Sequence, residues 1–335
     1  MRVLDIPTIQ SIIKTIGLVE FYQRLIMQLE QDFMNWHKFY KSPRHAIHYD
    51  HGVIELMPCS DDEFYSFKYV NGHPCNTEND HLCVVAMGML ADVKSGYPLI
   101  LSEMTILTAI RTAAVAAMGA KLLARRKSKK LAIIGCGAQS EFQVKAMQSV
   151  FPITHINAFD IDVTAMHKFH KNLSTDFNQI NCCNSAVEAI SDADIIITAT
   201  AANKHDTLFT EKYIAKGTHI HAMGGYSPGK TELGISLLKH SKLIVEFSPQ
   251  SLLEGEIQQL NESHIHAELW QILKGEKKAR ENDNEITIFD SVGFAVEDYS
   301  VLKLIYEFST ELNLGTNIDL IPDLDNPKDL YSLIL

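Results

Sequence analysis

The sequence contains few of the residues that build a disulfide scaffold: only six of its 335 residues are cysteines. The cysteines form no CxxC pair and no Cys/His ligand spacing, so we expect reduced thiols and no metal site. No unbroken apolar run of about 18 residues occurs, and polar residues interrupt the N-terminal stretch where a signal peptide would have its apolar core. The sequence therefore predicts a cytoplasmic protein without a membrane partner.

Positive charge is also scarce. Lysine and arginine total 30 against 41 aspartates and glutamates, which gives a formal net charge of -11. Such a surface repels a phosphate backbone except at a local basic patch, so a nucleic acid is not an expected partner. The one dense basic run, at 125–130, directly precedes an apolar strand pattern and is interpreted as a solvated helix end.

Short β-branched apolar runs recur in the second half of the chain, with helical patterns between them. A chain of this length is expected to form about two domains. Strands that alternate with helices are typical of a parallel, doubly wound α/β sheet, which we predict here. The runs lie at 131–135, 156–160, 194–200, 219–225, 242–247 and 285–291.

The first 125 residues have a different pattern and predict a separate α+β unit. Apolar residues at helical spacing between Ile12 and Leu29 predict one long amphipathic helix. Turn-rich clusters between 44 and 100 predict antiparallel strands. The alanine-rich stretch 105–124 predicts a helix that connects the two units. A last helix, after about residue 300, either ends the parallel sheet or returns to the first unit; periodicity leaves both open.

A dinucleotide-binding turn is indicated by the sequence LAIIGCGAQSEFQVKAM, which begins at Leu131. Gly135 permits a tight turn after the strand, Gly137 lets the backbone approach a pyrophosphate, and small Ser140 replaces the third glycine. The helix that begins near Ala138 offers unpaired N–H groups to a phosphate. Asp160 ends the next strand, where a carboxylate binds the ribose hydroxyls and favours NAD over NADP, whereas we expect Asp162 to cap the following helix.

Charged residues in apolar surroundings mark a second candidate site, because an unpaired buried charge is costly. Glu55 and Lys68 lie in neighbouring strand patterns, nearly opposite each other if PCSDDE closes a hairpin. An ordinary cross-strand ion pair is the favoured interpretation. Arg44 and Arg111 carry planar forks that suit a carboxylate, although a structural salt bridge is the commoner role for either one alone.

With these motifs in view, the chain resembles the ornithine cyclodeaminase/mu-crystallin family, most closely its bacterial cyclodeaminases. The resemblance implies a homodimer that binds an amino acid and NAD. It divides the chain into a substrate-binding and dimerisation domain (1–125 and 305–335) and a Rossmann domain (126–304). The stretches that carry it are KSPRHAIH, GVIELMP, FKYVNGHPCNT, LADVKSGYPLILSEMT, AIRTAA, GCGAQSEFQ, SPGKTEL, EGEIQQL and FDSVGFAVEDY.

The resemblance also implies roles for individual residues. Arg44, Lys68 and Arg111 would bind the substrate carboxylate and assist proton transfer, and Glu55 would bind a substrate amino group. Burial between two arginines would lower the pKa of Lys68. The implied cofactor contacts are Cys83, Thr112, Gly135, Gly137, Ala138, Gln139, Ser140, Asp160, Thr200, Lys230 and Val292.

The reaction that the resemblance implies is the NAD-dependent conversion of L-ornithine to L-proline and ammonia. Two residues, however, differ from those that cyclodeaminases have at the same positions. Tyr226 stands where those enzymes have an aspartate that binds the reacting amino group, and a phenol is neutral at pH 7. Cys83 stands in place of a threonine. Three hypotheses follow: a cyclodeaminase that tolerates Tyr226, an oxidoreductase acting on a related amino or imino acid, and a non-catalytic NAD-binding protein.

Overall fold

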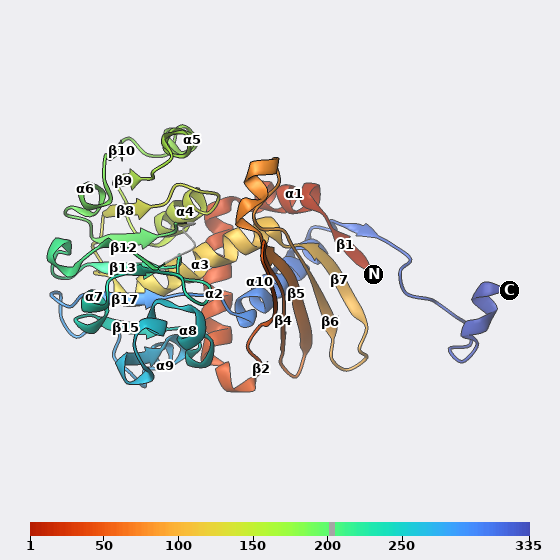
Figure 1. Ribbon diagram of the computed structural model, residues 1–335. Helices are drawn as coiled ribbons and strands as arrows, with labels where there is room; N and C mark the ends of the chain where they lie inside the picture. The colour runs from red at the N-terminus through yellow and green to blue at the C-terminus, as the bar shows by residue number, and fades with distance from the viewer. Residues whose placement is uncertain (201–204) are drawn as a thin grey trace.

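A computed structural model describes residues 1–200 and 205–335 of the protein and contains two large sheets with long helices between them (Figure 1). Sheet A is built from the first unit and one strand near the C-terminus, in the order β18-β1-β7-β6-β5-β4-β2, with β3 also paired to β4. Its strands from β3 to β7 are antiparallel, as predicted. The strands are β1 (Arg2–Leu4), β2 (Tyr40–Lys41), β3 (His45–Tyr49), β4 (Gly52–Ser60), β5 (Phe64–Gly72), β6 (Ala86–Asp92), β7 (Pro98–Glu103) and β18 (Thr316–Asn317).

The predicted long N-terminal helix is in fact two helices, α1 (Ile6–Ile16) and α2 (Leu18–Met34). Gly17 separates them with φ of 88°, a left-handed conformation that a helix interior does not contain. Sequence periodicity missed the break because apolar residues keep their three- and four-residue spacing across it. The two helices therefore pack at an angle rather than as one rod.

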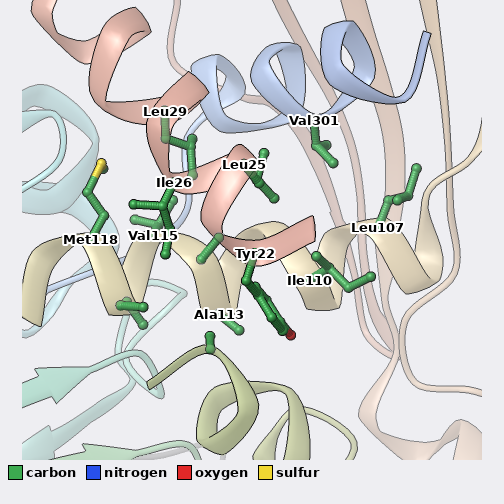
Figure 2. Close-up of a cluster of buried hydrophobic side chains, with 14 of the residues drawn as sticks. Tyr22, Leu25, Ile26, Leu29, Leu107, Ile110, Ala113, Val115, Met118 and Val301 are labelled. Atoms are coloured by element: carbon green, nitrogen blue, oxygen red, sulfur yellow. The ribbon is translucent and has the colours of Figure 1, made fainter. Parts of the chain in front are cut away.

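The core between the sheets is formed by α2, α3 (Thr105–Leu123) and α10 (Ala295–Glu311). Figure 2 shows Tyr22 and Leu25 of α2 packed against Ile110 of α3, with Val301 of α10 close by. By length and composition α3 is apolar enough to cross a membrane, but most of it is buried inside the protein, as expected for a core helix. Helix α10 lies against β4, β5 and β6, so the last helix returns to sheet A.

Sheet B is the predicted doubly wound sheet, and every strand pair in it is parallel. Its order is β10-β9-β8-β11-β13-β17-β15-β16. All six predicted strands are confirmed, and two short ones, β10 and β16, escaped prediction. The strands are β8 (Lys130–Ile134), β9 (His155–Phe159), β10 (Ile180–Cys182), β11 (Ile195–Thr198), β13 (His219–Ala222), β15 (Lys242–Val245), β16 (Ile265–Glu268) and β17 (Thr287–Asp290).

The connections of sheet B place a switch in strand order between β8 and β11, where ligands bind in open α/β sheets. Two short strands, β12 (His205–Phe209) and β14 (Thr231–Leu233), form a separate small sheet. The helices of this part are α4 (Ser140–Val150), α5 (Val163–Leu173), α6 (Ala186–Ile190), α7 (Ile235–Lys239), α8 (Ser248–Glu254) and α9 (Leu269–Leu273).

Candidate active site

Arg44 joins the edge of sheet A to the loops at the carboxyl ends of sheet B. Its Nη1 lies 3.1 Å from Glu55 Oε1, and its Nε lies 3.4 Å from Glu254 Oε2 on α8. Its Nη2 donates to the main-chain oxygens of Val292 and Gly293, in the loop after β17. The guanidinium is therefore held at the boundary between the two sheets by groups from both.

Two further cations, Lys68 on β5 and Arg111 on α3, share a single carboxylate. Lys68 Nζ lies 2.8 Å from Asp298 Oδ1, and Arg111 Nε lies 3.0 Å from the same oxygen. Arg111 also pairs with Glu297 through its Nη1. All of these side chains are buried, and the two carboxylates come from the first turn of α10. The C-terminal helix thus supplies the counter-charges for cations from the first third of the chain.

The predicted ion pair between Glu55 and Lys68 is wrong. Val70 lies opposite Glu55, and Met57 lies opposite Lys68, so the β4–β5 hairpin pairs in a different register from the one predicted. Glu55 instead binds Arg44, and Lys68 binds Asp298. Both residues still point to the buried face of sheet A, since they occupy buried positions of their strands.

Burial and the neighbouring Arg111 lower the pKa of Lys68 to about 8, against the opposing effect of Asp298. Burial also acts on Arg111, but Asp298 and Glu297 outweigh it and raise the pKa of this guanidinium. Arg111 therefore stays charged, whereas the lowered pKa of Lys68 favours proton exchange closer to neutral pH than in an ordinary lysine. Of these two buried cations, only the lysine is suited to acid–base chemistry.

The glycine turn after β8 has the geometry that a dinucleotide requires. Gly135 has φ of 100°, and a Cβ there would lie 2.4 Å from the Ala199 oxygen. Gly137 is exposed, and a Cβ added to it would meet nothing within 4 Å. Helix α4 begins at Ser140, two residues later than predicted, and no side chain caps its N-terminus. An open glycine and an uncapped helix start leave room and N–H donors for a phosphate.

Asp160, at the end of β9, is half-buried and faces this turn. Its Oδ2 accepts from the Cys136 N–H at 2.6 Å, and its Oδ1 accepts from the Asp162 N–H at 2.9 Å. Asp162 caps α5 through the Thr164 N–H, as predicted. Sequence reasoning missed Lys168 on α5, whose Nζ lies 3.0 Å from the Gly137 oxygen and 2.9 Å from Glu141 Oε1 in the first turn of α4.

Thr200 and Lys230 lie together on the far side of the switch point. Lys230 Nζ donates to the Thr200 oxygen at 2.9 Å, and both the amide and hydroxyl of Thr200 donate to Glu232 Oε1. The Glu232 carboxylate packs directly against Gly224. A Cβ added to this glycine would lie 2.0 Å from the carboxylate atoms. This contact explains the glycine after β13.

The other predicted cofactor residues are distributed around these groups. Ala138 is exposed and Gln139 half-buried in the turn before α4, and Thr112 is half-buried next to Arg111 on α3. Cys83 is half-buried, with its Sγ 3.5 Å from the Pro74 oxygen. Val292 lies in the loop that accepts Arg44.

Tyr226 lies at the carboxyl end of β13 and is 38% exposed. The Lys230 ammonium stands 3.8 Å from the centre of its ring. Burial, followed by Cys83 and Glu232, raises the pKa of the phenol, so Tyr226 is neutral at pH 7 and acts as a hydrogen-bonding group rather than a base. Burial lowers the pKa of Lys230 to about 8, against the charges of Glu232 and Glu256.

Four carboxylates that sequence reasoning missed organise the site. Asp298, Glu297 and Glu254 pair with the cations, and Glu246 accepts from the N–H groups of Val292 and Gly293 at 3.0 and 2.9 Å. A signal for two of them was present, because Glu297 and Asp298 follow directly on the apolar run Val292–Val296.

A Rossmann-type sheet with an open glycine turn, facing a second sheet that carries buried cations, defines a two-part α/β enzyme of the kind that joins a dinucleotide to a small anionic substrate. The chain belongs to the ornithine cyclodeaminase/mu-crystallin family, whose profile matches residues 8–312.

The proteins similar to this chain have more than one enzymatic activity. Ornithine cyclodeaminase from Agrobacterium tumefaciens (strain Ach5) is 46% identical over 332 residues, covering 99% of this chain and 93% of that protein. The Thermococcus litoralis Δ1-pyrroline-2-carboxylate reductase, solved with NADH and L-proline, has a TM-score of 0.87 and 34% identity, covering 95% of this chain and all of the other.

Two further solved structures are similar over almost the whole chain. A lysine cyclodeaminase, solved to explain its recognition of L-lysine, L-ornithine and L-2,4-diaminobutyric acid, has a TM-score of 0.93 and 25% identity, covering 99% of both chains. An archaeal alanine dehydrogenase dimer with bound NAD has a TM-score of 0.88 and 30% identity, covering 96% of this chain and 99% of the other.

Proposed function

We propose that the protein is an NAD⁺-dependent ornithine cyclodeaminase, which converts L-ornithine to L-proline and ammonia. The observation that carries the proposal is the full-length similarity to ornithine cyclodeaminases, at 46% identity. The buried cations Lys68 and Arg111, with the half-buried Arg44, support it as candidate groups for binding an amino acid. The reaction is redox-neutral overall: the substrate loses one ammonia and closes a ring.

The cations divide the work of holding the substrate. Arg44 and Arg111 present guanidinium forks that suit the α-carboxylate, and both are already held by protein carboxylates. Lys68, between them and with a pKa of about 8, takes and returns a proton on the reacting amino group. Glu55 holds the distal ammonium and, on accepting its proton, frees the amine that closes the ring.

The residues of the glycine turn fit NAD. The Gly137 position leaves room for the pyrophosphate, Lys168 lies beside it in an ion pair with Glu141, and Asp160 accepts from the ribose hydroxyls. When bound, NAD⁺ supplies a hydride acceptor and donor at the Cα of the substrate. Tyr226 donates a hydrogen bond to the reacting nitrogen in this proposal, in place of a carboxylate.

Turnover of L-ornithine tests the proposal directly. Purified protein with L-ornithine and a catalytic amount of NAD⁺ is expected to release ammonia and proline in equal amounts without accumulating NADH. Protein that binds NAD⁺ but forms neither product would contradict the proposal and favour a non-catalytic role.

A second candidate function is reduction of a cyclic imino acid, and Tyr226 is the observation that favours it. A neutral phenol supports hydride transfer to an imine but supplies no carboxylate for loss of ammonia. The reductase of Thermococcus litoralis shares the fold. Stoichiometric NADH oxidation with Δ1-pyrroline-2-carboxylate, without turnover of ornithine, selects this function. A large gain in ornithine turnover in the Tyr226→Asp variant would also favour the reductase function for the natural protein.

The pH dependence of kcat/KM follows from Lys68. Because its pKa in the free enzyme is lowered to about 8, the amine is mostly protonated below that pH and becomes available as a proton acceptor above it. We expect kcat/KM for L-ornithine to rise with pH and to level off above about 8. A kcat/KM that does not change between pH 6 and 9 would show that Lys68 takes no part in the proton transfer.

Glu55→Gln tests recognition of the distal amine. Removing the charge of a buried acceptor for an ammonium is expected to raise KM for L-ornithine by about 10- to 100-fold. L-norvaline, which has the same carboxylate but no distal amine, serves as the matched ligand, and its inhibition constant should change far less. Equal loss for both ligands would show that Glu55 acts only by holding Arg44.

We further propose a homodimer formed through the outer face of sheet A. That face is apolar and uncovered: its alternate positions carry Ile47, Tyr49, Leu56, Tyr65 and Met87, each at least 39% exposed. An apolar patch of this extent marks a protein interface. The alanine dehydrogenase relative is described as a dimer.

We also propose how the chain divides into domains. The dimerisation domain consists of residues 1–125 and 305–335, and the NAD domain consists of residues 126–304. The enzyme is proposed to work in the cytoplasm.

A further inference from the structure

The C-terminal segment, residues 319–335, leaves the body of the protein, and all of its residues except the half-buried Ile321 and Leu324 are exposed. Figure 1 shows it running outward from β18 to a short terminal helix. No residue after Ser309 is buried, and neither hydrophobic core includes any of residues 319–335. Every hydrogen bond found for these residues joins them to one another.

The segment is nevertheless rich in exposed apolar side chains. Leu330, Tyr331, Leu333, Ile334 and Leu335 are each at least 51% exposed. Four of them lie in a 3-10 helix, Leu330–Ile334, in which residues three apart fall on the same side, so Leu330 and Leu333 form one apolar edge. A turn of this length does not persist alone in water. Apolar side chains gathered in this way favour contact with another surface.

We propose that residues 319–335 form an arm that packs on the second copy of the chain in the dimer. The inference rests on the proposed homodimer. The arm leaves from β18, the edge strand of sheet A, whose uncovered outer face is the proposed dimer surface. At roughly 3.3 Å per residue, the extended arm reaches up to about 55 Å, enough to cross from that edge onto a neighbouring subunit.

The pattern of similarity supports an arm that belongs to this branch of proteins. The family profile ends at residue 312, before the arm begins. The similarity to the Agrobacterium ornithine cyclodeaminase and to the lysine cyclodeaminase structure nevertheless covers 99% of the chain, so it continues into the arm. A segment outside the common family region but shared with cyclodeaminases is expected to act within their own assembly.

Site-specific photocrosslinking tests where the arm lies. A benzophenone amino acid replaces Tyr331, and in a matched variant it replaces Tyr213, an exposed tyrosine on the NAD side of the molecule. Irradiation of the Tyr331 variant is expected to give a covalent band of dimer size, and the Tyr213 variant is expected to remain monomeric on the denaturing gel. Crosslinks of the Tyr331 variant that stay within one chain would overturn the arm.

Truncation after Ile318 measures what the arm contributes. We expect the dimer dissociation constant, measured by sedimentation at dilution, to rise about tenfold or more, and the triple variant Leu330→Ser, Leu333→Ser, Ile334→Ser to match it. The double variant Asp323→Asn, Asp325→Asn keeps the apolar residues and is the control. If the full-length chain is monomeric, both the proposed dimer and the proposed arm are wrong. If the truncated chain dimerises as tightly as the full-length chain, only the proposed arm is wrong.

Discussion

Replacing Lys68 with methionine is expected to lower kcat/KM for L-ornithine by about 1,000-fold, the usual size of a lost acid–base group. Methionine keeps the unbranched shape and fits a site where the lysine is 1% exposed. The substitution removes the cation that pairs with Asp298, but Arg111 remains on the same oxygen, so the carboxylate keeps a partner. The fold should therefore survive.

Two measurements separate chemistry from structure in the Lys68→Met variant. NAD⁺ affinity should stay within a few-fold of the natural protein, because Lys68 lies on sheet A rather than at the glycine turn. The rise of kcat/KM with pH should also disappear. A variant that keeps activity within tenfold of the natural protein would show that Lys68 is no more than a structural partner of Asp298.

Gly135→Ala is expected to abolish useful NAD⁺ binding and to destabilise the protein. A left-handed alanine costs about 1–2 kcal/mol, which lowers the Tm of a protein of this size by several degrees. The new Cβ would also lie 2.4 Å from the Ala199 oxygen and 3.0 Å from the Thr200 nitrogen, forcing β8 and β11 apart at the switch point. We expect NAD⁺ to bind about 100-fold more weakly, since a loss of some 2.7 kcal/mol is enough.

Gly137→Ala is the matched control for that experiment. Its Cβ meets no protein atom within 4 Å and its φ is not positive, so the Tm should not change. NAD⁺ affinity should still fall, because the methyl group occupies the space offered to the pyrophosphate. Normal NAD⁺ binding in both variants would show that the dinucleotide does not bind at this turn.

The sequence predicts the parallel sheet well because each of its six main strands is a compact β-branched run between turn signals. The strands β10 and β16 are short and polar, and their runs do not stand out from loops. The break at Gly17 was hidden for another reason, since a single left-handed residue changes the direction of a helix without disturbing its apolar spacing.

The candidate cations were also predictable, whereas their partners were not. Lys68 and Arg111 stood out as charges in apolar segments, but Asp298, which binds both, lies far along the chain on α10. Local patterns carry no information about contacts over such separations. The hairpin register failed for a related reason: shifting β4 against β5 by two residues keeps the same side chains on the buried face, so hydrophobic alternation does not choose between the registers.

The return of α10 to sheet A has a consequence for synthesis of the protein. The strands of sheet B all lie between residues 130 and 290, so that sheet is complete once they leave the ribosome. Sheet A, although made first, keeps its inner face uncovered, and Lys68 and Arg111 lack their carboxylates, until residues 295–311 emerge. During translation, the half of the protein that is made first is therefore the last to reach its final form.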